Sequence, residues 1–175
     1  MTLPAAIRVA YEKAKVGFVF TRRGVIMEAA SHYFLPRLIG YSKTMHLITT
    51  GSTYPATHPL VSSLFTETLP TPEATVDRAV ELATEIAENT SILAWALNRD
   101  LVWRGGATAE EAHILDSKVI WDLFDREDNK EGIKSFMEKR KPEFTATFSN
   151  PEVVPVAYPW WTPVDTKIPL KASKL

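Results

Sequence analysis

The sequence predicts an α/β fold in which short strands come first and helices form most of the remaining chain. Two runs rich in valine, isoleucine and phenylalanine, at 7–10 and 16–20, have the composition of strands. Further along, apolar residues recur every three or four positions, which is the spacing of a buried helix face. Six of the 12 prolines fall from Pro142 onward, so neither helix nor central strand is expected there.

The predicted elements follow one another in a clear order. The pattern becomes helical from Glu28, and the next helices are expected at 42–50 and 56–64, before a brief strand at 65–69. The clearest helix begins at Thr71-Pro72-Glu73, which supplies a cap, a proline suited to the first turn and an acid that favours the helix dipole. That helix should end near Asn89. Further helices are predicted at 91–104, 109–124 and 131–140, with Gly105-Gly106 and a polar turn at 125–129 between them.

Composition excludes several classes of function. The 175 residues are 45% hydrophobic, which is enough for a core, and the net charge of −1 gives no electrostatic footprint for nucleic acid or an anionic membrane. No apolar run reaches the length of a membrane span. Without cysteine there is no disulfide, thiolate nucleophile or zinc–thiolate site. The four histidines show no metal-ligand spacing: His32, His46, His58 and His113.

The stretch at 17–40, GFVFTRRGVIMEAASHYFLPRLIG, places a single acid, Glu28, among apolar and small residues. It resembles the crotonase (enoyl-CoA hydratase/isomerase) superfamily, and specifically its fungal and peroxisomal Δ3,Δ2-enoyl-CoA isomerase-like members. The resemblance continues to EGIKSFMEKRKPEF at 131–144, but matches only the second half of a complete family member. It implies a partial crotonase-like fold, with a remnant of the strand spiral and the helical C-terminal region within 1–144. Residues 145–175 would then form an extended, proline-rich tail.

The resemblance implies that Glu28 is the catalytic base. In the family this glutamate follows proline in motifs such as PEGCSS or PEAASS, whereas Met27 precedes it here. Moving a 3-enoyl thioester to the 2-enoyl form needs a base that removes a proton from C2 and returns one to C4. The second glutamate of the family's hydratases aligns with Phe20, which disfavours hydration by two glutamates. The alternative role for Glu28 is a helix-start acid stabilised by the dipole.

Two further residues are implied in substrate binding. Lys139 matches a lysine that contacts the nucleotide end of coenzyme A, and Phe136 matches an aromatic position near the acyl-CoA. The alternatives are a solvated basic helix end for Lys139 and a core aromatic for Phe136. The implied function is chemistry on the double bond of a fatty acyl-CoA, in fatty-acid oxidation or a specialised acyl or toxin pathway. Coenzyme A enters as part of the substrate thioester, and no separate cofactor is expected.

In the family the oxyanion hole lies in the N-terminal half of the fold, so this chain alone is expected to be a poor enzyme or none. The alternative is a non-catalytic remnant that associates with full-length family subunits, and a trimer-based homo-oligomer is also expected.

The last three residues, Ser173, Lys174 and Leu175, form the tripeptide read by the peroxisomal import receptor. They predict a peroxisomal location, with an ordinary basic tail as the alternative.

Overall fold

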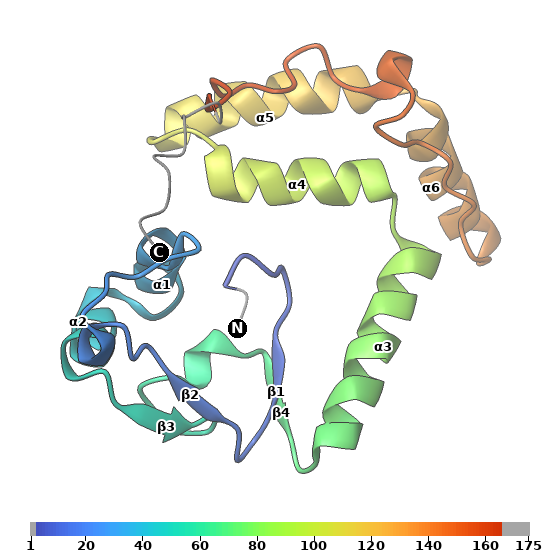
Figure 1. The fold of residues 1–175 in the computed structure, drawn as a ribbon. Coiled ribbons are helices and arrows are strands. Elements are labelled where there is room, and N and C mark those ends of the chain that lie inside the picture. The colour runs from blue at the N-terminus through green and yellow to red at the C-terminus, as the bar shows by residue number, and fades with distance from the viewer. Residues whose placement is uncertain (1–2, 166–175) are drawn as a thin grey trace. The chain divides into compact units, whose positions relative to one another are not determined.

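The computed structural model describes residues 3–165, and the chain divides into two compact units, Met1–Glu85 and Ile86–Leu175 (Figure 1). Among the described residues, all the strands lie in the first unit, and the second is helical. The predicted tail residues 145–165 belong to the second unit, while the targeting tripeptide lies outside the described residues. A mixed α/β fold is therefore confirmed.

Two small sheets organise the first unit. Strand β1 (Val9–Tyr11) pairs in parallel with β4 (Glu67–Leu69), and β2 (Lys15–Gly17) pairs antiparallel with β3 (Thr53–Pro55). The parallel pair joins segments that are far apart in the sequence. Leu3 and Pro4 line a cavity together with Gly17 and Phe18 at the end of β2.

Two short helices cover the core of the first unit. They are α1 (Ser31–Ile39) and α2 (Tyr41–Thr50), joined by Gly40 at a positive φ of 80°. Leu35 of α1 and Leu47 of α2 are completely buried. Other buried side chains of this core come from loops, strand β2 and a 3₁₀ turn; they include Leu3, Val16, Phe18, Val61 and Leu64.

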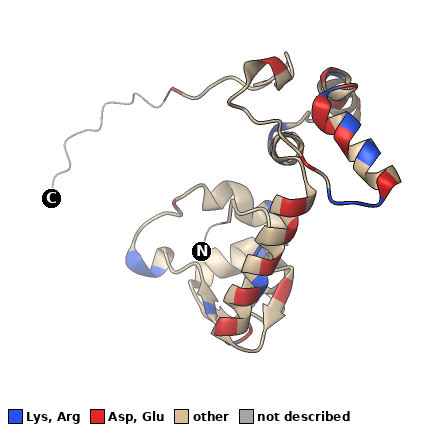
Figure 2. Cartoon of the chain, turned by 90° about the vertical axis from the view of Figure 1, so that its right-hand side faces the viewer, with Lys and Arg blue, Asp and Glu red and all other residues tan. Residues whose placement is uncertain are grey.

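Helix α3 (Pro72–Asn89) confirms the clearest sequence prediction. The Thr71 hydroxyl accepts a hydrogen bond from the backbone N–H of Ala74 at 3.1 Å, as an N-cap does. No residue of α3 is buried within the described range, and Val76 and Val80 are exposed. Acidic positions recur along this helix (Figure 2). The helix thus contributes no buried side chain to the core of the first unit.

Three helices build the second unit: α4 (Ile92–Arg104), α5 (Ala109–Leu123) and α6 (Glu127–Glu138). Ser91 and Thr108 cap α4 and α5 by accepting from backbone N–H groups three residues ahead. Leu93 and Leu97 of α4 pack with Val119 of α5 to form a second core. Within its described part, 145–165, the tail carries no helix or strand apart from a 3₁₀ turn at Pro151–Val153, as its prolines predict.

Some predictions of elements were wrong. Residues 56–64 form no α-helix, because Pro59 lacks the N–H of an interior helical residue; only a 3₁₀ turn, Ser62–Leu64, occurs there. Strand β3 was not predicted. Helix α6 starts at Glu127 rather than at 131, so the predicted polar turn is mostly helix; its acids Glu127 and Asp128 suit the positive end of the helix dipole. Among the described residues, no helix is both long and apolar enough to cross a membrane.

Candidate functional site

Glu28 lies in the loop that leads into α1, with its side chain exposed. Its backbone is nevertheless fixed from both sides. Met27 packs against the first core, and the backbone N–H of Ser31 donates to the Glu28 carbonyl oxygen at 2.9 Å. The buried Ser31 hydroxyl donates to the same carbonyl. The loop therefore presents Glu28 from a defined position.

The backbone after Glu28 adopts a conformation that alanine rarely takes. Ala29 and Ala30 have φ angles of 49° and 54°, both in the left-handed region. For non-glycine residues this region costs about 1–2 kcal/mol each, and such strain clusters at active sites. The sequence predicts a helix from Glu28, but this left-handed backbone delays the start of α1 to Ser31. The spacing of apolar residues does not predict the left-handed backbone. The one sequence signal for it is the run of small residues at 29–31.

Glu28 borders a cavity of about 300 Å³ in the first unit, which Phe18 and Phe20 also line. Among the lining residues that the structure describes, Glu28 carries the only titratable side chain. The Phe20 ring lines the same pocket as Glu28. The pocket combines one carboxylate with apolar walls. The carboxylate is open to solvent within this unit, not dry as its predicted chemistry requires.

Phe136 and Lys139 lie together at the end of α6 in the second unit. Phe136 is 81% exposed. Lys139 is the C-cap, with a left-handed φ of 54°, and its N–H donates to the carbonyl of Phe136 at 3.3 Å. Glycine is the usual residue at a left-handed cap. Lys139 instead places a cationic side chain at the C-terminal end of α6, on a backbone conformation that is strained for a non-glycine residue.

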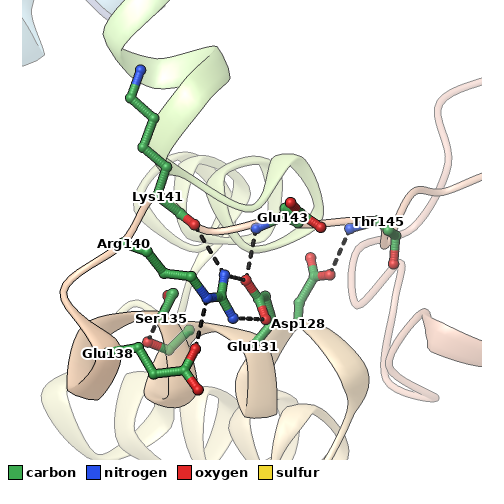
Figure 3. A network of polar contacts seen from close by, with 9 residues as sticks. Asp128, Glu131, Ser135, Glu138, Arg140, Lys141, Glu143 and Thr145 are labelled. Carbon is green, nitrogen blue, oxygen red and sulfur yellow. Dashed lines mark hydrogen bonds and ion pairs between the residues drawn. The ribbon is translucent and has the colours of Figure 1, made fainter.

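An ion-pair network holds the chain next to Lys139 (Figure 3). The Arg140 guanidinium donates to Glu131 at 2.9 Å and to Glu138 at 2.7 Å. Glu131 also accepts from the backbone N–H of Glu143 at 2.8 Å. These hydrogen bonds, with Arg140 the larger cause, lower the pKa of Glu131 to about 2. The end of α6 is thereby tied to the segment that follows it.

A larger cavity of about 610 Å³ lies within the second unit. It is bounded by all three helices and by the segment after α6, and its walls are largely apolar; they include Leu93, Ile120, Phe136 and Phe144. A cavity of this size and lining suits a hydrocarbon chain.

The other polar candidates have structural roles or stay apart. Arg22 donates to the Thr50 carbonyl at 2.7 Å and to the Ser52 hydroxyl at 3.0 Å, which fixes the loop to the end of α2. No cluster of three or more metal-ligating side chains occurs within residues 3–165.

Comparisons with known proteins agree on one family. The family model described as enoyl-CoA hydratase/isomerase matches residues 1–147. An enoyl-CoA hydratase of Alternaria alternata is 47% identical over 147 residues, which is 84% of this chain and 50% of the relative. A probable enoyl-CoA hydratase of Bacillus subtilis is 32% identical over 146 residues, or 82% of this chain and 56% of that protein.

Solved structures give the same result. A probable enoyl-CoA hydratase/isomerase from Mycobacterium abscessus superimposes with a TM-score of 0.76 at 28% identity, covering 83% of this chain and 57% of that one. An enoyl-CoA hydratase from Bacillus anthracis superimposes with a TM-score of 0.73 at 27% identity, covering 81% and 55%. The chain spans about half the length of the curated relatives that it matches.

Proposed function

Because the chain belongs to the enoyl-CoA hydratase/isomerase family, we propose that it supplies Glu28 as the general base for moving a double bond in a fatty acyl-CoA. The Glu28 carboxylate takes a proton from C2 of the 3-enoyl thioester. The electron pair left on C2 forms the new C2–C3 double bond through the enolate, and the protonated Glu28 returns the proton to C4. The proton only changes carbon, so no water or redox partner is consumed.

One observation favours isomerisation over hydration. Among the described residues that line the pocket, Glu28 is the one titratable side chain, and Phe20, which the family resemblance matches to the hydratases' second glutamate, lines it too. A phenyl ring accepts no proton, so the two-carboxylate scheme has no second group here. The relatives are named hydratases, but that name refers to those proteins and does not assign hydration to this chain.

The enolate also needs charge stabilisation and the substrate needs anchoring. Since the chain spans about half of its relatives, we assign the oxyanion donors to sequence that corresponds to their other half. We assign Lys139 to a coenzyme A phosphate, which an ammonium can neutralise as a mobile charge, and Phe136 to the acyl chain. Once substrate and the sequence corresponding to the other half cover it, Glu28 would be shielded from solvent. A carboxylate removed from water is a stronger base.

The test joins this chain to the N-terminal half of the Alternaria relative and measures isomerisation and hydration separately. Glu28→Gln should lower kcat for isomerisation by about 10²–10⁴ or more while acyl-CoA binding stays nearly unchanged. Glu73→Gln, on the exposed start of α3, serves as the matched control and should keep full activity. Efficient hydration that survives Glu28→Gln would contradict the proposal.

We also propose a peroxisomal location from Ser173, Lys174 and Leu175. A reporter that carries the last residues should gather in peroxisomal puncta, and deleting Leu175 should leave it diffuse. A reporter that stays diffuse with the intact tripeptide would show that the match is coincidental.

Exposed apolar side chains favour a second candidate, a non-catalytic partner of full-length family subunits. Val76 and Val80 of α3 and Phe136 and Met137 of α6 are all exposed in the chain alone, and such surfaces drive association. On this reading the chain co-elutes with a full-length family enzyme and stays inactive itself. A monomer with a cooperative melt, and no effect on that enzyme, would exclude it.

A further inference from the structure

We propose that residues 145–161 form a strap on which the helical unit depends for its closed fold. Most of the strap lies beyond residue 147, where the family match ends. Figure 1 shows the segment after α6, in orange to red, running back along α5. The sequence alone predicted an extended, proline-rich tail, whereas the segment contacts all three helices of the second unit.

Three aspartates, one for each helix, accept hydrogen bonds from the strap. Asp128 of α6 accepts the backbone N–H groups of residues 145 and 146, at 2.9 and 3.1 Å. Asp122 of α5 accepts the N–H of Val156 at 2.8 Å. Asp100 of α4 accepts the Tyr158 hydroxyl at 3.4 Å. Donors spread along one segment thus tie together three helices.

The contact with α4 matters most, because Asp100 is a buried acid with only 5% of its residue surface exposed. The Arg99 guanidinium also lies 3.6 Å from the Asp100 carboxylate. Burial, together with the nearby Asp100 charge, raises the pKa of Tyr158. A tyrosine hydroxyl is protonated at neutral pH even at its ordinary pKa, so Tyr158 is a donor to this buried acid.

The strap also caps α4 and closes the second core. The Trp160 indole N–H donates at 3.0 Å to the carbonyl of Arg104, one of the end carbonyls that lack a partner inside a helix. The Arg104 guanidinium lies 4.2 Å from the centre of the Trp161 ring. Tyr158 and Trp160 pack against the core of Leu93, Leu97 and Val119, together with Val153 and Val154. Residues matched by the family model leave this core incomplete.

The test is hydrogen exchange on the full chain, followed at the amides of the C-terminal half of α4. Trp160→Ala should speed exchange there by at least about tenfold, equivalent to about 1.4 kcal/mol of lost protection. Tyr158→Phe keeps the ring but removes the donor to Asp100, and should give a smaller increase at the same amides. Trp121→Ala, a matched loss of a tryptophan that is 78% exposed on α5, should leave α4 unchanged.

Two outcomes separate the strap from a passive appendage. Faster exchange confined to the strap variants, or loss of folding in Trp160→Ala while Trp121→Ala folds, supports the proposal. Unchanged α4 protection in both Trp160→Ala and Tyr158→Phe would overturn it, since the helical unit would then close without these contacts.

Discussion

The guanidinium of Arg78 binds the carboxylate of Glu67 through two hydrogen bonds, each 2.9 Å long. This bidentate pair joins the first half of α3 to strand β4, and the Arg78 hydrogen bond is the main reason that the pKa of Glu67 is lowered. Since α3 buries no residue within the described range, this pair is a main side-chain tie between the helix and the rest of the first unit.

Arg78→Lys should weaken that tie, because an ammonium cannot form the paired fork. Both side chains are about one-third exposed, so the loss of stability should be small and should shrink in high salt. Urea midpoints at low and high salt measure it, with Arg23→Lys in an exposed turn as the control. Equal midpoints for both variants at low salt would contradict the prediction.

Acid should weaken the second unit through Glu131. The pKa of Glu131 lies at about 2 in the folded chain against a usual 4.5, so the folded state favours the ionised form. Its stabilising contribution is complete above pH 4.5 and is lost as the pH falls from there toward 2. Urea unfolding across this range should show a steeper loss in the native chain than in Glu131→Gln. Parallel pH profiles would rule out the assigned role of the Arg140 pair.

Core packing predicts a large loss on truncating Leu35. This side chain is completely buried, so Leu35→Ala should lower the free energy of unfolding by about 2–5 kcal/mol. Ile26 is 87% exposed, and Ile26→Ala should change it by no more than about 0.5 kcal/mol. Chemical denaturation compares the two, and a similar loss in both would show that the first core is not where the structure places it.

The same substitution should have opposite effects at two alanines. Ala30→Gly relieves a left-handed alanine and should raise the free energy of unfolding by up to about 1 kcal/mol. Ala83→Gly, on an exposed face of α3, should lower it by about 1 kcal/mol. Thermal and urea unfolding of the pair measure the difference in sign. A loss at Ala30 as large as that at Ala83 would mean that the loop is not strained.

The helices could be predicted because their signals are local. Thr71, Ser91 and Thr108 each cap a helix through a hydrogen bond that spans only three residues. Strand β3 could not be predicted, since its three residues include a proline and its partner β2 lies about 40 positions earlier. Pairing over such a separation depends on tertiary packing, which no local pattern carries.

The candidate site divides in the same way. The family resemblance predicts Glu28 as the base and matches Phe20 to the hydratases' second glutamate. Their shared pocket, and the left-handed backbone at 29–30, required the fold. The contacts of the strap with Asp100 and Asp122 could not be predicted from the sequence either. An aspartate in a helical segment usually faces solvent, so neither residue stood out as a contact site.

The ring packing in the strap has an optical consequence. The Trp160 and Trp161 rings lie 5.3 Å apart at 88°, and Tyr158 stands edge-on to Trp161 at 5.2 Å and 89°. Rings held in one asymmetric arrangement give near-ultraviolet circular dichroism that vanishes when packing becomes fluid. Neighbouring indoles at right angles couple their electronic transitions, so their band reports the closed strap directly. The chain thus carries an intrinsic, label-free probe that distinguishes release of the strap from melting of the helices, which the far-ultraviolet signal follows.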